Sequence, residues 1–260
     1  VGTNNVFNQD GGTLTITGTF HMVADTLNFN GGNVSGIPLL SSSALNFGVG
    51  GTSAATFKII GTSTLTGDVS SGQNVLVSGD PTLGFHAPLT VDAGGGFLNE
   101  GTIELSSTHS ARNSTLVVNN GVFTNGPSGV LDIMQGAGGN RTVTVDLVND
   151  GTVNVNRNTS FSRSGGTYTN NAAFNINAGT ITVGTNNVFN QDGGTLTITG
   201  TFNMVADNLI SSRRRLTGTR LVRSARLSVG AGGTSAATFK IIGTSTLTGD
   251  ISSGQNVLVS

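Results

Sequence analysis

Carboxylates and histidines are the side chains that could carry acid–base, hydrolytic or metal chemistry here, since the sequence has no cysteine. Glycoside hydrolysis would need two carboxyl groups roughly 5–10 Å apart. Glu104 and Asp132 fall inside runs with strand pattern and could face outward, but neither has an obvious partner on the same face. Four other acidic residues are each followed by glycine and are expected to form turns: Asp10, Glu100, Asp150 and Asp192.

The remaining titratable residues also favour structure over catalysis. Asp25 and Asp68 recur as Asp207 and Asp250, which suits a repeated element better than a single active site. The histidines His21, His86 and His109 are scattered, and no metalloprotease, nucleophile-elbow or phosphate-loop motif is present. We therefore expect no catalytic residue, no cofactor and no metal site, with calcium in the turns as an open alternative.

The segments that would position these side chains are short runs of alternating polar and apolar residues. Examples are TLTI at 13–16, TLVV at 115–118 and TVTV at 142–145. Alternation with period two and enrichment in β-branched residues are typical of strands. Glycine is abundant, at 40 of 260 residues, and N-x-G, D-G and G-G sequences between the runs mark tight turns. The sequence therefore predicts an all-β protein.

A long repeat divides the chain. Residues 1–25 recur at 183–207 with one change, and residues 50–78 recur at 232–260 with one change. Both matches have the same offset, 183 − 1 = 182. We therefore interpret residues 1–182 as one full unit and residues 183–260 as a partial second copy, both within one continuous solenoid domain.

A shorter, degenerate period lies inside the long unit. An aromatic residue, Asn, a turn and then alternating Thr and apolar residues recur along it. The asparagines are Asn8, Asn30, Asn99, Asn125, Asn149, Asn170 and Asn190, and the aromatic residues are Phe7, Phe29, Phe97, Phe123, Tyr168 and Phe189. The numbers of successive asparagines differ by between 20 and 26, except for a step of 69 that fits three rungs of 23.

This period predicts a right-handed parallel β-helix, a β-solenoid whose rungs have about 20–26 residues. Stacked rungs place equivalent residues about 4.8 Å apart. The asparagines would then form amide ladders, and the aromatic rings would fill the interior. A β-sandwich, alone or in a tandem array, is the alternative because it also produces strands at similar spacing.

The pattern F-x-N-x-G-T-[IVL]-x-[IVL], as in FLNEGTIEL from Phe97, also occurs in a known class of proteins. It resembles the rungs of bacterial β-helical surface proteins, namely filamentous-haemagglutinin-like adhesins and autotransporter passenger domains. The resemblance covers most of the chain. It implies display at the bacterial cell surface or outside the cell, with a role in adhesion or fibre formation.

Residues 208–231, here called the arginine block, break both repeats although their length matches that of residues 26–49. They hold six of the chain's 12 Lys and Arg residues: Arg213, Arg214, Arg215, Arg220, Arg223 and Arg226. One interpretation is a basic patch for nucleic acid or anionic polysaccharide. We favour two compensating frameshifts, because GGC-GGC codons preceded by C, displaced by one base, turn Gly-Gly into Arg-Arg. Resequencing the gene would decide between them.

Composition supports a folded, weakly charged protein. The formal net charge is −1 and the mean hydropathy is +0.08, so the chain can bury surface. We expect a structural extracellular or cell-surface solenoid, not an enzyme, that forms or displays a stiff fibre. The expected partner is the protein itself, end to end or side by side, with neither nucleic-acid binding nor membrane insertion. The alternatives are an adhesin that binds surface glycans through a lateral face and a β-helical polysaccharide-degrading enzyme.

Overall fold

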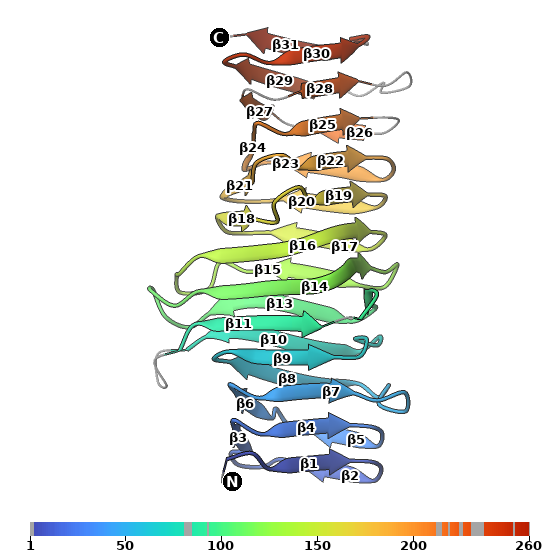
Figure 1. The fold of residues 1–260 in the computed structure, drawn as a ribbon, viewed down its shortest axis with the longest axis vertical. Helices are drawn as coiled ribbons and strands as arrows, with labels where there is room; N and C mark the ends of the chain where they lie inside the picture. The colour runs from blue at the N-terminus through green and yellow to red at the C-terminus, as the bar shows by residue number, and fades with distance from the viewer. Residues whose placement is uncertain are drawn as a thin grey trace.

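The computed structural model describes residues 3–80, 85–92, 94–211, 215–217, 219–223, 226–229, 237–251 and 253–259. Within them the chain contains no helix and winds through about eleven turns of stacked strands (Figure 1). Every pairing between strands is parallel, for example β1 (Val6–Gln9) with β4 (Thr26–Phe29). Figure 1 shows the near strands running to the right while the chain climbs from the N-terminus, which is the sense of a right-handed coil. The predicted parallel β-helix is confirmed, and the β-sandwich alternative is wrong.

The strands lie on three faces, which the chain visits in a fixed order. The first face holds β1, β4, β7 (Ala44–Phe47), β9 (Ser63–Thr66), β11 (Ala87–Asp92), the first halves of β14 (Ser114–Asn125) and β16 (Arg141–Asn149), β18 (Thr159–Phe161), β21 (Thr180–Val183), β24 (Thr201–Val205), β27 (Thr219–Arg223), β29 (Ala237–Ile242) and β31 (Gln255–Val259).

The second face follows the first along the chain. It holds β2 (Thr13–Thr15), β5 (Asn33–Ser35), β12 (Phe97–Asn99), the second halves of β14 and β16, β19 (Thr167–Asn170), β22 (Val188–Gln191), β25 (Asn208–Ser211), β28 (Arg226–Val229) and β30 (Thr246–Gly249). Because β14 and β16 continue around one corner, most strands of the first two faces belong to one 19-stranded sheet.

The third face is a separate ten-stranded sheet that closes the coil. It holds β3 (His21–Val23), β6 (Leu39–Ser41), β8 (Ala55–Ile60), β10 (Gln73–Gly79), β13 (Thr102–Ser107), β15 (Val130–Ile133), β17 (Thr152–Val155), β20 (Ala173–Ile176), β23 (Thr195–Ile198) and β26 (Arg215–Thr217).

The interior is filled by the inward half of each strand. In β16 every second residue is buried, from Arg141 to Asn149. On the second face one inward column runs through Phe97, Phe123, Leu147, Tyr168 and Phe189. All five side chains are at most 2% exposed. Burying such side chains stabilises the fold by roughly 1.5–3 kcal/mol each, so the apolar half of the alternation determines which way every strand faces.

The corners depend on local sequence. Asn4 and Asn186, copies in the long repeat, have φ values of 63° and 64°, a left-handed conformation that Asn tolerates better than most residues. Elsewhere glycine is required by close approach of the next rung. A Cβ on Gly151 would collide with the carbonyl oxygens of Gly126 and Gly129. The N-x-G signal in the sequence therefore marks places where consecutive rungs touch backbone to backbone.

Candidate functional site

A buried ladder of side-chain amides runs along the second face next to the aromatic column. Asn99 donates through Nδ2 to Oδ1 of Asn125 at 2.8 Å, and Asn125 donates in the same way to Asn149 at 2.8 Å. Asn149 donates to Asn170 at 2.7 Å, and Asn170 donates to Oε1 of Gln191 at 3.0 Å. All five residues are fully buried. The ladder satisfies polar groups that would otherwise be unpaired inside the core.

Three predicted ladder asparagines lie elsewhere. Asn8 and Asn30 are exposed, and Asn190 points outward and is half-buried. Each directly follows a phenylalanine, so the two side chains point to opposite faces of a strand with period two. In the true ladder copies the asparagine comes two residues after the apolar residue and shares its inward face. Placing Asn190 in the ladder is therefore wrong, and Gln191 occupies that position, paired in register with Asn170.

Asn8 is exposed and belongs instead to an outward-facing row on the first face. Asn28 donates through Nδ2 to Oδ1 of Asn8 at 2.7 Å, and Asn46 donates in turn to Asn28 at 2.8 Å. Thr66 continues the row by donating to Oδ1 of Asn46 at 2.5 Å. Asn30 lies at a corner and donates to Oδ1 of Asp10 at 2.7 Å.

The predicted aromatic column is also divided between two faces. Phe97 and Phe123 stack with ring centroids 5.4 Å apart, and Tyr168 and Phe189 continue the same column. Phe7 lies on the first face in register with Leu27, and its ring contacts that of Phe20 at 5.2 Å. Phe29 is in register with Gln9, not with Phe7, because it lies two positions beyond Leu27 on the same strand.

Glu104 and Asp132 are partners on one face, contrary to the sequence interpretation. They lie opposite each other on β13 and β15, half-buried and facing outward on the third face. Burial, with the neighbouring Asp132 carboxylate as a smaller cause, raises the pKa of Glu104. Burial also raises the pKa of Asp132. A corner loop lengthens the rung between them, and the strand pattern of the sequence does not predict that loop.

An outward amide row extends this acidic pair. Asp132 is in register with Asn154, which is in register with Asn175. Asn175 donates to Oδ1 of Asn154 at 3.0 Å, and Asn156 donates to Oδ1 of Asp132 at 3.4 Å. Among the described residues, no third acid or histidine joins the two carboxylates into a metal-binding group.

Asp25 and Asp207, copies in the long repeat, each bind the backbone beside a corner. Asp25 accepts from the N–H of Asn5 at 2.8 Å and of Val23 at 3.1 Å, and these bonds, that of Asn5 above all, lower its pKa. Asp207 accepts from the N–H of Asn187 at 2.7 Å and of Val205 at 3.2 Å. Burial nevertheless raises the pKa of Asp207 to about 6. Both carboxylates therefore serve corner geometry.

Arg141 is a buried cation that sequence reasoning missed. It is 1% exposed, and its guanidinium donates to the carbonyl oxygens of Leu105 at 3.2 Å, Gly138 at 2.8 Å and Gln135 at 3.1 Å. Burial lowers its pKa to about 10, so it remains charged at neutral pH. A signal was available, since the alternation of TVTV at 142–145 places residue 141 on the inward side. Its role is to hold the corner loop between β15 and β16.

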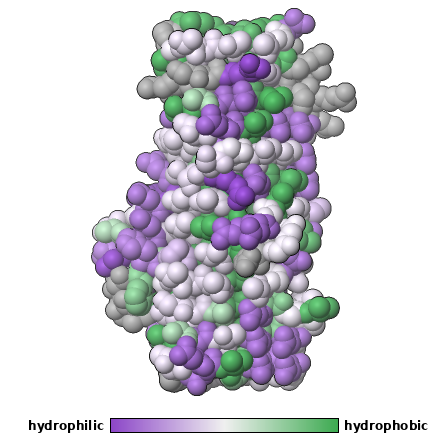
Figure 2. Space-filling model, in the orientation of Figure 1, coloured by the Kyte–Doolittle hydropathy of each residue, from purple (hydrophilic) through white to green (hydrophobic). Residues whose placement is uncertain are grey.

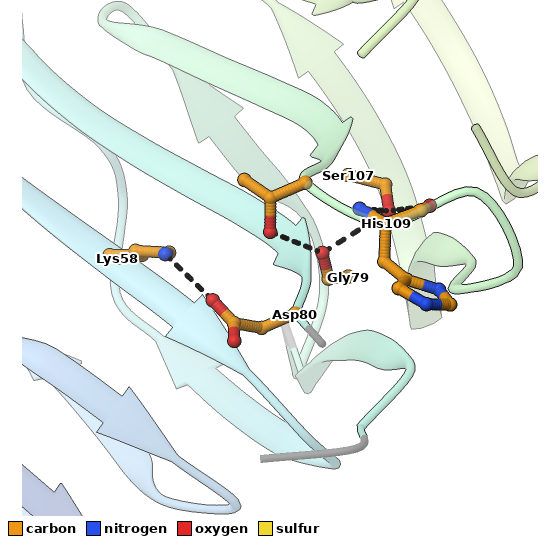
Figure 3. A network of polar contacts seen from close by, with 6 residues as sticks. Lys58, Gly79, Asp80, Ser107 and His109 are labelled. Atoms are coloured by element: carbon orange, nitrogen blue, oxygen red, sulfur yellow. Dashed lines mark hydrogen bonds and ion pairs between the residues drawn. The ribbon is translucent and has the colours of Figure 1, made fainter. Parts of the chain in front are cut away.

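His109 and His86 lie at a corner between the third and first faces, His109 after β13 and His86 before β11. Figure 3 shows the surroundings of His109. The hydroxyl of Ser107 lies 3.1 Å from the carbonyl oxygen of Gly79 and accepts from the N–H of His109 at 3.1 Å. Lys58 forms an ion pair with Asp80 at 3.0 Å close by.

Each of these histidines binds backbone locally. Nδ1 of His109 accepts from the N–H of Ala111 at 3.1 Å, and Nδ1 of His86 accepts from the N–H of Asn113 at 3.1 Å. Both imidazoles order loops, and His21 lies far away on β3.

The arginine block continues the coil. Leu209 and Leu227 are fully buried, as are Leu27 and Leu45 at the matching positions of the first copy. Arg226 is exposed on β28. Arg213 and Arg214 lie outside the described residues, as do the side chains of Arg215, Arg220 and Arg223.

The side of the solenoid seen in Figure 2 is mostly hydrophilic or neutral, with hydrophobic residues scattered over it. A hollow of about 380 Å³ on the first face is lined by Asn140, Arg141, Thr142, Asn158, Thr159, Ser160, Thr180 and Thr182. A membrane-spanning helix is absent from the described part of the chain.

Comparison with known proteins gave a weak similarity. No family model matches the chain, and no curated protein shows a significant match. Among solved structures, the crystal structure of a TibC-catalysed, hyper-glycosylated fragment of TibA (residues 55–350) is similar. The sequence identity is 15% and the TM-score 0.29, over 99% of this chain and 96% of the other. Values this low do not establish a relationship.

Proposed function

We propose that this protein is a structural β-solenoid that forms or displays a stiff fibre outside a bacterial cell or on its surface. The observation that carries the proposal is the unbroken parallel stack, in which successive copies of one sequence continue the same coil. A rod reuses one shape along its length, whereas an active site needs only one copy. Catalysis, nucleic-acid binding and membrane insertion have no part in the proposed role.

Stiffness follows from three kinds of interaction directed along the axis. Backbone hydrogen bonds join every rung to the next, as between β10 and β13 over six residue pairs. The amide ladder from Asn99 to Gln191 adds side-chain bonds in the same direction. The packed interior resists bending because close-packed side chains have low compressibility.

The proposed partner is a second copy of the chain, stacked end to end or side by side. A solenoid presents unpaired strand edges and an uncovered apolar interior wherever its stack ends. Pairing such an end with another copy satisfies the backbone groups and covers the apolar side chains.

Electron cryo-microscopy of the purified protein tests this proposal. We expect filaments with an axial layer line near 4.8 Å, the spacing of stacked strands. Isolated short rods at every concentration examined would overturn self-assembly into fibres.

The alternative role is an adhesin that binds surface glycans through a lateral face. It is favoured by the hollow lined by Thr142, Ser160, Thr182 and neighbouring asparagines, which offers hydroxyl and amide groups suited to sugar hydroxyls. A glycan array probed with the rods would detect such binding, and loss of the signal in Ser160→Trp would locate it at this hollow.

A polysaccharide-degrading enzyme is the third candidate, because Glu104 and Asp132 lie in register on neighbouring strands. Release of reducing sugar from a polysaccharide would reveal this activity.

A further inference from the structure

The long repeat does not span a whole number of turns. Eight successive strand pairings lead along the first face from β1 to β21, through β4, β7, β9, β11, β14, β16 and β18. The second copy of β1 is β22, the next strand after β21, and it lies on the second face. One unit of the long repeat therefore makes eight turns and one further face.

The same shift holds for other copied strands. His21–Val23 forms β3 on the third face, whereas its copy is part of β24 on the first. Likewise β8 and β10 belong to the ten-stranded sheet, whereas their copies β29 and β31 belong to the 19-stranded sheet. Each copied segment therefore stacks on a different face from its original.

The copied segments nevertheless fold in the same way. Met22 and Met204 are 1% and 0% exposed, and Phe57 and Phe239 are both 0% exposed. The corner residues Gly72 and Gly254 have φ values of 82° and 85°. All three faces accept these segments because each offers an inward column of apolar side chains and each corner is specified locally.

In space the copies return to the same side. Figure 1 shows β22, β25 and β28 on the near side, running in the same direction as β1, β4 and β7. It also shows β24 and β27 at the edge where β3 and β6 lie. The sheets therefore wind around the axis by one face over the length of one unit, as expected from the twist of stacked strands.

We infer that the length of the long repeat offsets the winding of the sheets, so that each copied outward side chain returns to the same side of the solenoid. Eight and one-third turns at about 4.8 Å per turn place the copies about 40 Å apart. Each side then carries its own row of repeated groups. A partner that binds one row meets it again in the next unit, which adds avidity without any new contact.

The inference goes beyond fibre formation and is tested on single molecules. The chain has no cysteine, so spin labels can be attached at chosen sites. One variant carries Asn8→Cys and Asn190→Cys, a copied pair. The other carries Asn8→Cys and Thr182→Cys, which share the first face but belong to no common repeat position.

Pulsed electron paramagnetic resonance gives the distance in each variant. We expect about 40 Å for the copied pair and a distance roughly 5 Å longer for the pair on the first face, from the rise of stacked strands and the width of one face. Straight sheets would give the reverse order, and that result would overturn the inference. Neither outcome depends on whether filaments form, so failure of the proposed function remains distinguishable.

Discussion

Asp25 and Asp207 have the same role at two copies of one corner, yet their surroundings shift their pKa values in opposite directions. The largest influence on the pKa of Asp25 is the hydrogen bond from the N–H of Asn5, which favours the carboxylate. The largest influence on the pKa of Asp207 is burial, which favours the protonated acid. Identical sequence therefore does not give identical titration, because the rungs stacked above and below differ.

The pH dependence of stability should show this difference. The pKa of Asp207 rises from 3.8 to about 6 on folding, so its contribution is full at low pH and declines by about 3 kcal/mol as pH rises from 3.8 through 6. Asp25 contributes in the opposite sense, losing its contribution as pH falls through its folded pKa. In urea unfolding from pH 3 to 7, the free energy of unfolding of Asp207→Asn should therefore rise relative to that of wild type as pH rises. That of Asp25→Asn should fall relative to wild type as pH rises through the acidic part of that range. The same trend in both variants would contradict the assignment.

The facing carboxylates Glu104 and Asp132 give a second test at this scale. Like charges opposite each other on neighbouring strands destabilise a sheet. Asp132→Asn removes one charge and extends the amide row of Asn154 and Asn175. We expect the free energy of unfolding to rise by about 0.5–1 kcal/mol at pH 7. The gain should vanish at pH 3, where both acids are protonated. Asp150→Asn, at a half-buried corner position, is the control.

Among the strands and corners, the amide ladder is the element most open to mutation. Asn149→Ala would deprive the Nδ2 of Asn125, the Oδ1 of Asn170 and the carbonyl of Ala173 of this partner. Each unpaired buried group costs about 1–3 kcal/mol, so we expect a loss of about 3 kcal/mol. Asn8→Ala, at an exposed position of the outward-facing row, should cost less than about 0.5 kcal/mol. Equal effects in chemical unfolding would show that burial of the ladder is unimportant.

The sequence predicted the strands, but it predicted only some of the residues in the buried amide ladder. Alternation with period two identifies the runs and predicts the parallel stack, because equivalent blocks recur at rung spacing. The same period separates Asn99, two residues after Phe97, from Asn190, directly after Phe189. Corner loops add variable lengths between strands, so the facing of Glu104 with Asp132 could not be derived from their spacing.

For the molecule as a whole, two copies of one sequence provide an internal comparison. The segment QNVLV occurs in β10, which is paired on both sides, and in β31, which among the described residues pairs only with β29. Intrinsic exchange rates are set by sequence, so any difference reports structure. We expect hydrogen exchange to be much faster at 255–259 than at 73–77.

The segment ATFKII is the matched control for this measurement. It forms β8 and β29, both of which are paired on two sides. Their exchange rates should therefore lie much closer together than those of the QNVLV pair. Equal protection of both QNVLV copies would indicate that another chain covers β31 in solution.

The buried amide ladder has a direction, since every member from Asn99 to Asn170 donates toward the C-terminal end, and each member from Asn125 to Gln191 accepts from the one before it. Reversing one amide would set two donors against each other on one side and two acceptors on the other. The five buried amide groups must therefore all point the same way, and their dipoles add along the axis. The column is electrically polar, with an oxygen at the Asn99 end and an N–H at the Gln191 end. Rods joined head to tail would bring unlike poles together, whereas rods joined head to head would oppose them.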